Sequence, residues 1–382
     1  MSVVMLSNEL PAPKGWVRAE LEQDSSWIRP LTVQEITDLE NSLRQVLALG
    51  KAEFELSAAD FALTECTRAL LTEVMQATQT RYGLCLVRGF PVANWSKADL
   101  RTLFWCLGLC CGVPRPQGKQ SQYVSDVTNT GGTYRGGTGR GYNTNSKLDF
   151  HADGSDIVGL MCLQTAKSGG TSLLSSSLTA YTELKKQRPD LAAVLTEPFY
   201  FSRQGEHAAE EPPYYLASIV GEKKGRFACR HIRNHIIGAQ LTFEEVPRLT
   251  AQQTEALDMF DALLARPDIC FHMELEPGDI QFVNNHVTLH ARTEYEDYPE
   301  PERRRHLLRL WLSLPQAQAL PEAWRLAYKD VDAQALRGGF RGVGITDEVR
   351  SFEKRLCAEH EMAFRVYEDY EAMLNNTNAL QG

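Results

Sequence analysis

Apolar residues recur at helical spacing in the first part of the chain. Between residues 33 and 49 they fall on one stripe, and Gly50 follows as a stop signal. The pattern repeats over residues 59–78, and residues 98–111 are typical of a third helix. A short apolar run over residues 82–91 is instead typical of a strand, because it is brief and ends in glycine and proline. We therefore expect residues 1–81 to form an N-terminal helical region.

The pattern then stops over residues 112–147, a stretch rich in Gly, Thr, Ser and Asn with little apolar periodicity. A segment this long without regular structure is uncommon in a compact domain and usually functional or disordered. We interpret it as a flexible flap at the mouth of a site.

Short apolar runs separated by turn residues fill the chain from residue 148 to residue 315. This pattern predicts many short strands and a double-sheet barrel or jelly roll. The expected strands lie near residues 147–153, 157–166, 171–177, 197–203, 213–220, 226–232, 271–276, 279–285 and 306–314, with helices at about 178–197 and 251–266. Beyond Pro315 the pattern turns helical again. We expect one elaborated α+β domain over residues 1–382, with a mainly β core over residues 82–315 and a helical extension over residues 316–382.

Composition narrows the classes of protein that fit. The chain has 382 residues, 43% of them hydrophobic, and a formal net charge of −9, which is ordinary for a globular protein. An acidic chain does not favour nucleic acid or an anionic membrane as its main partner. No apolar run approaches the roughly 18 residues that span a bilayer, and the N-terminus does not resemble a secretory signal. Nine cysteines, an odd number, are typical of reduced thiols, so we expect a cytoplasmic protein.

Two groups of potential metal ligands have a simpler interpretation. Cys106, Cys110 and Cys111 lie in an apolar helical stretch and are expected to pack there. His231 and His235 have the spacing of a zinc-protease helix, but Ile232 stands where that motif needs glutamate. Their surroundings are more typical of a strand, so we do not expect a second metal site.

The tripeptide His151-Ala152-Asp153 falls where a predicted strand ends. Residues i and i+2 of a strand point to the same face, so the imidazole and the carboxylate can converge on one ion. On its own this tripeptide is a weak signal, because it arises often by chance.

A second segment strengthens this signal. After a predicted strand at residues 280–283 come His286 and His290, either of which could supply a second imidazole. Two histidines and one carboxylate form the facial triad that suits Fe(II) and oxygen chemistry, because it leaves coordination positions open. A structural zinc site would close its shell with four protein ligands.

An arginine-dense stretch follows at residues 303–312. Arg305 and Arg309 are four positions apart and share one face of the expected strand, whereas Arg304 points the other way. Arg303 and Arg304 are typical of a solvated surface. Arg309 is flanked by leucines and tryptophan, so it must meet an anion there, because an unpaired buried charge is costly.

Taken in order, these motifs carry a resemblance. The runs HAD, SGGTS, PGDIQFVNNHVTLHAR and RRHLLRLWL resemble the taurine dioxygenase and clavaminate synthase family of Fe(II)/2-oxoglutarate oxygenases. The resemblance extends from about Gly83 to Leu314. The segments on either side contribute nothing to it.

The resemblance implies a double-stranded β-helix and assigns roles to particular residues. The iron ligands would be His151, Asp153 and His290; the context Leu-His-Ala-Arg selects His290 over His286. Arg305, fifteen residues further on, would bind the distal carboxylate of 2-oxoglutarate. A hydroxyl of the Gly-Gly-x-Ser turn would assist it, namely Ser172, with Thr171 as its neighbour. Arg309 would bind the acid group of the substrate.

The activity that the resemblance implies is oxidation of a substrate C–H bond, coupled to conversion of 2-oxoglutarate and molecular oxygen into succinate and carbon dioxide, with ascorbate as a supporting reductant. Because Asp153 is a carboxylate, the halide-binding variant is disfavoured. The leading hypothesis is hydroxylation of a small carboxylate- or amino-acid-like molecule. Desaturation or oxidative cyclisation remains an alternative outcome of the same chemistry. A non-catalytic, cupin-like metal-binding protein is the alternative from another class. The sequence is compatible with a homo-oligomer.

The substrate contacts are the least determined part of the prediction. In the flap, Tyr142 and Asn145 are the first candidates. Further candidates are polar residues of the flap or close to the H-x-D motif and two tyrosines in a predicted strand. They are Asn143, Ser155, Asp156, Tyr214 and Tyr215.

Overall fold

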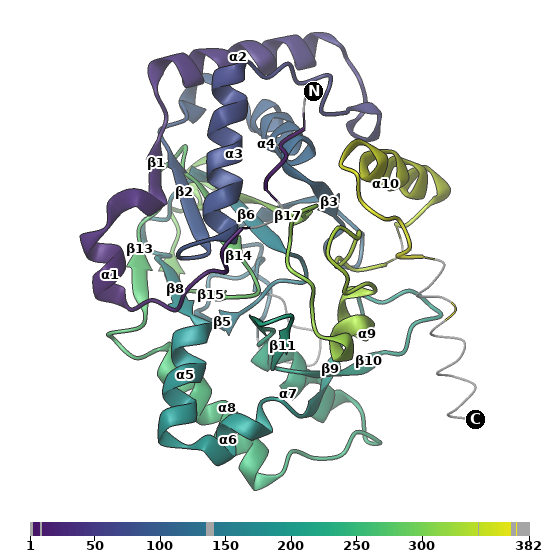
Figure 1. Cartoon of the computed structure of the whole chain (residues 1–382). Coiled ribbons are helices and arrows are strands. Elements are labelled where there is room, and N and C mark those ends of the chain that lie inside the picture. The colour runs from purple at the N-terminus through teal and green to yellow at the C-terminus, as the bar shows by residue number, and fades with distance from the viewer. Residues whose placement is uncertain (1–2, 8–9, 135–140, 343, 368–371, 373–382) are drawn as a thin grey trace.

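Two β-sheets lie between two groups of helices in the computed structural model of the chain (Figure 1). The structure describes residues 3–7, 10–134, 141–342, 344–367 and 372. The larger sheet, here called the major sheet, runs in the order β1-β2-β14-β6-β17-β3, and β4 also pairs with β17. Its strands are β1 Ile28–Pro30, β2 Leu84–Arg88, β3 Val113–Arg115, β4 Val124–Val127, β6 Ile157–Gln164, β14 Ile280–Asn284 and β17 His306–Ser313.

The smaller, or minor, sheet carries the H-x-D motif. It runs in the order β13-β8-β15-β5. Its strands are β5 Leu148–His151, β8 Ser172–Ser176, β13 Phe271–Met273 and β15 Thr288–Arg292. Three two-stranded pairs complete the β structure: β7 Ser168–Gly169 with β16 Tyr295–Glu296, β9 Pro198–Ser202 with β10 Tyr214–Ser218, and β11 Val220–Lys223 with β12 Arg226–Cys229.

Strand β17 shows how the sequence assigns the two faces of the major sheet. Leu308, Leu310 and Leu312 belong to the hydrophobic cluster under the N-terminal helices. The alternate residues Leu307, Arg309 and Trp311 line a cavity on the other face. This alternation follows from the two-residue period of a strand, and it places Arg309 inside the double-sheet core.

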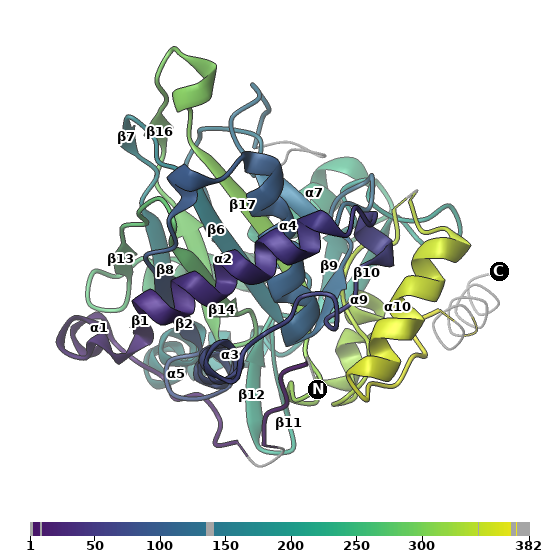
Figure 2. The same ribbon diagram turned by 90° about the horizontal axis from the view of Figure 1, so that it is seen from above.

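Helices α2, α3 and α4 cover the outer face of the major sheet (Figures 1 and 2). They are α2 Val33–Ala48, α3 Glu65–Gln79 and α4 Lys97–Cys111. Each begins at a hydroxyl residue whose side chain accepts a hydrogen bond from the first turn, which satisfies a backbone N–H that would otherwise lack a partner. Helix α4 buries Cys106, Cys110 and Cys111, as the sequence predicts for packing thiols.

A second group of helices packs against the minor sheet and the small pairs. They are α5 Ser177–Gln187, α6 Pro189–Val194, α7 Arg233–Thr242 and α8 Ala251–Leu264. The predicted helix over residues 178–197 is two helices, because Pro189 begins α6 and the chain breaks at Arg188. The short helix α1 Arg18–Gln23 lies beside β13 in Figure 1.

The C-terminal region folds back onto the core. It contains α9 Arg325–Tyr328 and α10 Asp347–Glu359. Glu353 of α10 is fully buried and accepts hydrogen bonds from Arg115 of β3, at 2.5 Å, and from Tyr123. Among the described residues, the helical prediction for residues 316–382 was too extensive, because much of the segment before α10 and residues 360–367 after it are irregular. Residues 368–371 and 373–382 lie outside the described residues.

The flap prediction is wrong for the first part of its range. Residues 113–115 and 124–127 form β3 and β4, which pair with β17 in the major sheet, and most of the residues between them are buried. These short strands were not predicted because their polar side chains obscure the apolar alternation of a strand. Residues 135–140 of the predicted flap lie outside the described residues. No helix in the described part of the chain is long and apolar enough to cross a membrane.

Candidate active site

Two histidines meet because two neighbouring strands of the minor sheet bring them together. Strands β15 and β5 are antiparallel, and His290 is paired directly with His151. Their ring centroids are 4.4 Å apart. Paired residues point to the same face of a sheet, so both imidazoles face the interior between the sheets.

Asp153 joins the two histidines just after β5 ends. Its backbone N–H donates to Oδ1 of Asn285 at 3.0 Å, which holds this part of the chain in place. Its Oδ2 lies 3.6 Å from Nε2 of His290. One potential ligand atom from each of His151, Asp153 and His290 lies within 4.8 Å of the others, and among the described residues this is the group of three or more His, Cys, Asp or Glu that could hold a metal ion.

The donor set fits Fe(II). Two imidazoles and one carboxylate on one side of an ion leave the other side open, as non-haem iron chemistry requires. His151 Nδ1 lies 2.8 Å from the backbone oxygen of Asp149, so Nδ1 carries the proton and Nε2 is the free ligand atom. Burial, reinforced by His151, lowers the pKa of His290 to about 3, which keeps this imidazole neutral as a ligand must be.

Asp153 is charged although it is buried. Burial raises its pKa, but Arg309, His290 and His151 outweigh that effect and leave the pKa below its usual range. Arg309 Nη1 lies 3.4 Å from Asp153 Oδ1, and its Nε donates to Oε1 of Gln117 at 2.7 Å. The sequence prediction that Arg309 meets an anion is therefore correct, but the anion that it meets within the chain is Asp153.

The cavity that contains these residues runs between the two sheets. The two sheets contribute apolar and charged side chains to its lining, and the loops and the start of α7 contribute polar ones. The residues include Gly118, Val127, Tyr134, Tyr142, Leu148, Phe150, Leu160, Ser172, Glu206, Arg233, Asn234, His235, Gln281, Arg292, Arg305, Leu307, Trp311 and Phe340. Arg305, Ser172 and Tyr142 line this cavity together with His151, Asp153 and His290.

Arg305 is buried, and the turn before Ser172 makes room for it. Gly170 has φ +75°, and a Cβ there would lie 3.0 Å from Arg305 Nε and 3.2 Å from its Cδ. The Gly-Gly turn of the SGGTS run therefore does two things: it adopts a backbone conformation that suits glycine, and it leaves space for the guanidinium. Burial lowers the pKa of Arg305.

Two predicted site residues need correction. The Thr171 hydroxyl donates to Oε1 of Glu274 at 2.7 Å in an exposed contact, and Thr171 does not line the cavity. Asn145 Nδ2 donates to the backbone oxygen of Tyr295 at 3.1 Å, so it fastens the chain and does not line the cavity. The other candidates, Asn143, Ser155, Asp156, Tyr214 and Tyr215, also lie outside the cavity lining.

The histidines set aside in the sequence analysis have other partners. His286 is buried, its Nε2 lies 2.8 Å from Oδ1 of Asp156, and it does not line the cavity. His231 Nε2 lies 2.6 Å from Oδ1 of Asp261. The strand expected to run through His235 was wrong: that residue is in α7 and lines the cavity.

The site also contains residues that the sequence motifs did not indicate. Arg292 and Gln281 line the cavity from β15 and β14, and Phe340 enters it from the C-terminal region. Arg292 had a signal that could have found it, since it follows His290 by two positions and shares its face. Burial, and then repulsion from Arg305, lowers the pKa of Arg292 to about 10.

Two facing sheets with an H-x-D motif, a distal histidine and an arginine at this position define the Fe(II)/2-oxoglutarate oxygenases with a double-stranded β-helix. The family described as "Taurine catabolism dioxygenase TauD, TfdA family" matches residues 44–311. The chain belongs to this family. It is an oxidoreductase that uses Fe(II) and 2-oxoglutarate.

Curated relatives agree with this assignment. The chain is 30% identical to FR-33289 synthase of Streptomyces rubellomurinus over 327 residues, 84% of this chain and 94% of the relative. It is 27% identical to the taurine hydroxylase-like protein SAT17 of Stachybotrys chartarum, covering 80% of each.

Solved structures share the fold. An asparagine oxygenase in complex with Fe(II), hydroxyasparagine and succinate superposes with a TM-score of 0.58 at 17% identity, covering 75% of this chain and 94% of the other. The oxygenase OrfP with iron and α-ketoglutaric acid gives a TM-score of 0.56 at 16% identity, covering 75% and 93%.

Proposed function

We propose that this enzyme hydroxylates a C–H bond of a small carboxylate- or amino-acid-like molecule. In this proposal His151, Asp153 and His290 bind Fe(II), and Arg305 with Ser172 binds the distal carboxylate of 2-oxoglutarate. Arg309 faces the anionic group of the substrate. The observation that carries the proposal is that Arg309 lines the same cavity as the three ligands and touches one of them.

The side chains divide the work as follows. Fe(II) held by His151, Asp153 and His290 would supply the oxidising chemistry, with 2-oxoglutarate as its co-substrate. The chain's own part is to orient the substrate and to exclude water from the reacting atoms. Leu160, Leu307 and Phe150 form apolar walls, while Arg309 offers a charged contact whose direction is fixed by Gln117. A substrate anchored through its anion would then present a C–H bond at a fixed distance from the metal.

Three similar proteins support a small anionic substrate without identifying it. Structures of OrfP have been solved with (3S)-hydroxy-L-Arg, and the asparagine oxygenase complex holds 3-hydroxyasparagine, so both neighbours bind hydroxylated amino acids. A relative that is 26% identical over 185 residues is named uridine-5'-phosphate dioxygenase, which points to a substrate with a different anionic group. Arg309 suits either, because a guanidinium binds carboxylate and phosphate oxygens alike.

The test is a screen of carboxylates, amino acids and phosphorylated small molecules for those that stimulate succinate formation from 2-oxoglutarate. We expect at least one anionic compound to stimulate turnover and to gain one oxygen atom. Loss of two hydrogens or formation of a ring would replace hydroxylation by desaturation or cyclisation. Stimulation only by uncharged compounds would overturn the role of Arg309.

The Arg309→Ala variant, assayed at saturating iron, sharpens the screen. It should lose stimulation by the substrate while keeping its affinity for 2-oxoglutarate. Arg309→Lys is the matched control, since it keeps the charge and gives up the two-pronged geometry, and it should retain part of the stimulation. Full stimulation of Arg309→Ala would contradict the assignment.

A further inference from the structure

Two buried arginines stand together at one end of the cavity. Arg292, on β15, and Arg305, just before β17, are each only 5% exposed, and both line the cavity. They share one neighbour, the ring of Tyr295: the guanidinium carbon of Arg292 lies 4.7 Å from its centroid, and that of Arg305 lies 5.1 Å away. The two positive charges are thus held close to each other.

Neither guanidinium finds partners within the described chain for all of its nitrogen donors. Arg292 uses Nη2 to donate to the backbone oxygens of Thr144 and Ser146, at 2.8 and 2.6 Å. Its Nε and Nη1 are buried and have no hydrogen-bond partner among the described residues, and the same holds for Nη1 of Arg305. Buried donors normally have partners, so three donors without one at the same end of a cavity point to a ligand.

The local charges do not balance either. Asp297 is the carboxylate that acts on both guanidinium groups, and its Oδ1 already accepts a hydrogen bond from the backbone N–H of Arg305 at 2.8 Å. One negative charge therefore faces two positive ones in a buried place. Because an uncompensated buried charge is costly, this end of the cavity favours one further anionic group.

We propose that Arg292 and Arg305 together form a paired-guanidinium site for the distal carboxylate of 2-oxoglutarate. Arg292 is thus a second binding residue for the co-substrate and makes the enzyme select a dicarboxylic 2-oxo acid. This inference rests on the proposed role of Arg305 and adds to it. A purely structural role for Arg292, fastening residues 144–146, uses only Nη2 and leaves Nε and Nη1 unexplained.

The test compares two 2-oxo acids that chelate iron identically and differ at the other end. 2-Oxoglutarate ends in a carboxylate, and 2-oxopentanoate ends in a methyl group. Each is titrated without oxygen into the Fe(II)-loaded protein, and binding is followed by the visible charge-transfer band of the chelated iron. This readout is direct and needs no substrate turnover.

For Arg292→Met we expect the affinity for 2-oxoglutarate to fall roughly 10- to 100-fold, the worth of hydrogen bonds to a charged group. The affinity for 2-oxopentanoate should stay within about twofold of the wild-type value, since that acid has no distal charge. Equal losses for both acids, or no loss for either, would overturn the inference.

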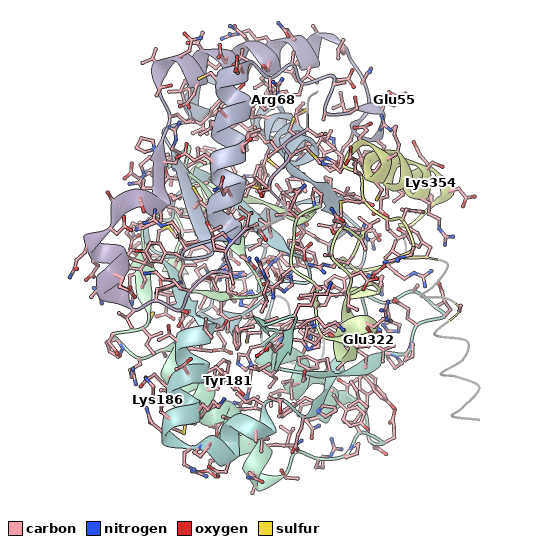
Figure 3. The ribbon with its side chains drawn as sticks, viewed as in Figure 1. Glu55, Arg68, Tyr181, Lys186, Glu322 and Lys354 are labelled. Atoms are coloured by element: carbon pink, nitrogen blue, oxygen red, sulfur yellow. The ribbon has the colours of Figure 1, made fainter. Side chains whose placement is uncertain are left out.

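Two further proteins keep the result interpretable. Arg292→Lys, which preserves the charge in case the methionine variant does not fold, should show a smaller loss that is still confined to 2-oxoglutarate. Arg68→Met is the matched control: Arg68 lies on α3, in the helical layer over the major sheet (Figure 3), outside the cavity lining, and it should bind both acids as the wild type does. A wild-type protein that showed no band with 2-oxoglutarate would overturn the proposed function itself. A normal wild-type preference that Arg292→Met retained would overturn only the role of Arg292.

Discussion

Arg309 Nη1 lies 3.4 Å from Oδ1 of Asp153, while Oδ2 of the same carboxylate lies 3.6 Å from Nε2 of His290. The carboxylate thus stands between the proposed substrate-binding arginine and a proposed iron ligand. Replacing a group that contacts a metal ligand typically lowers metal affinity by about 10- to 100-fold. The contact therefore links substrate recognition to the metal centre.

This link predicts that Arg309→Met weakens iron binding as well as substrate stimulation. We expect the affinity for Fe(II) to fall about 10- to 100-fold, because Asp153 loses the cation that orients it and keeps it ionised. Direct titration of the metal-free protein with Fe(II) measures the effect.

Gln117→Leu is the control for that titration. It removes the Nε partner of Arg309 and the hydrogen bonds from Gln117 Nε2 to the backbone oxygens of Tyr123 and Arg309, but it leaves the Arg309 guanidinium beside Asp153. It should shift the iron affinity by a smaller factor than Arg309→Met does. An unchanged iron affinity in Arg309→Met would show that the contact with Asp153 does not matter.

Gly170→Ala should weaken the binding of 2-oxoglutarate. The left-handed backbone costs a non-glycine residue about 1–2 kcal/mol, and the added Cβ would push against the Arg305 side chain. We expect the affinity for 2-oxoglutarate, followed by the charge-transfer band, to fall about tenfold, the factor that follows from losing about one charge-assisted hydrogen bond.

Gly225→Ala separates the two causes. Gly225 has a similar φ of +72°, but nothing lies within 4 Å of its Cβ position. This variant should be destabilised by a similar amount and bind 2-oxoglutarate normally. Equal binding losses in both variants would trace the effect to backbone strain alone.

Much of the fold was predictable because its elements are strongly patterned. The helical stripe over residues 33–49 became α2, and the apolar run over residues 157–166 became β6. The prediction failed where short strands carry polar residues or proline, as in β3 and β4, which depend on pairing with β17 for their structure. It also failed at α7, whose first residues lie against the cavity and gave no clear helical period.

The residues of the candidate site were likewise predictable only in part. The His151 and Asp153 pair was visible because a two-residue spacing fixes a shared face. Arg309 stood out as a charge flanked by leucines and tryptophan, whereas the role of Arg305 came from the resemblance to the family. Phe340 could not be found, since its place in the cavity depends on a C-terminal segment that returns across the core. Asn145 was misplaced for a similar reason, as its partner is 150 residues away at Tyr295.

Asp156→Asn should strongly destabilise the protein. The Asp156 carboxylate is 1% exposed and accepts hydrogen bonds from Nε of Arg337, at 2.8 Å, and from the backbone N–H of Leu314, at 3.0 Å. Arg337 is also buried, so the substitution leaves its charge without compensation at a cost of about 3–5 kcal/mol. Denaturant unfolding at neutral pH measures the loss. Asp190→Asn, which alters an exposed ion pair with Arg188, is the control and should change the stability little.

The same carboxylate predicts a pH dependence. Burial acts to raise the pKa of Asp156, but Arg337 and His286 outweigh it and lower the pKa to about 2 from the ordinary value of 3.8. The unfolded chain therefore takes up the proton first, and the stabilisation is complete above about pH 4 and lost as the pH falls towards 2. Wild-type stability should fall more steeply over that window than the stability of Asp156→Asn. Parallel curves would contradict the charge state assigned to Asp156.

The most direct test of the iron site is a comparison of wild type with His290→Gln, each stripped of metal and assayed for succinate from 2-oxoglutarate, with and without added Fe(II). The wild type should form succinate only with Fe(II). His290→Gln, with an unchanged fold by circular dichroism, should have an Fe(II)-dependent rate at least about 100-fold lower. Losing a metal ligand lowers metal affinity more than losing a group that contacts the ligand. Succinate formation that persists in the folded His290→Gln protein, or that needs no Fe(II) in the wild type, would contradict the account.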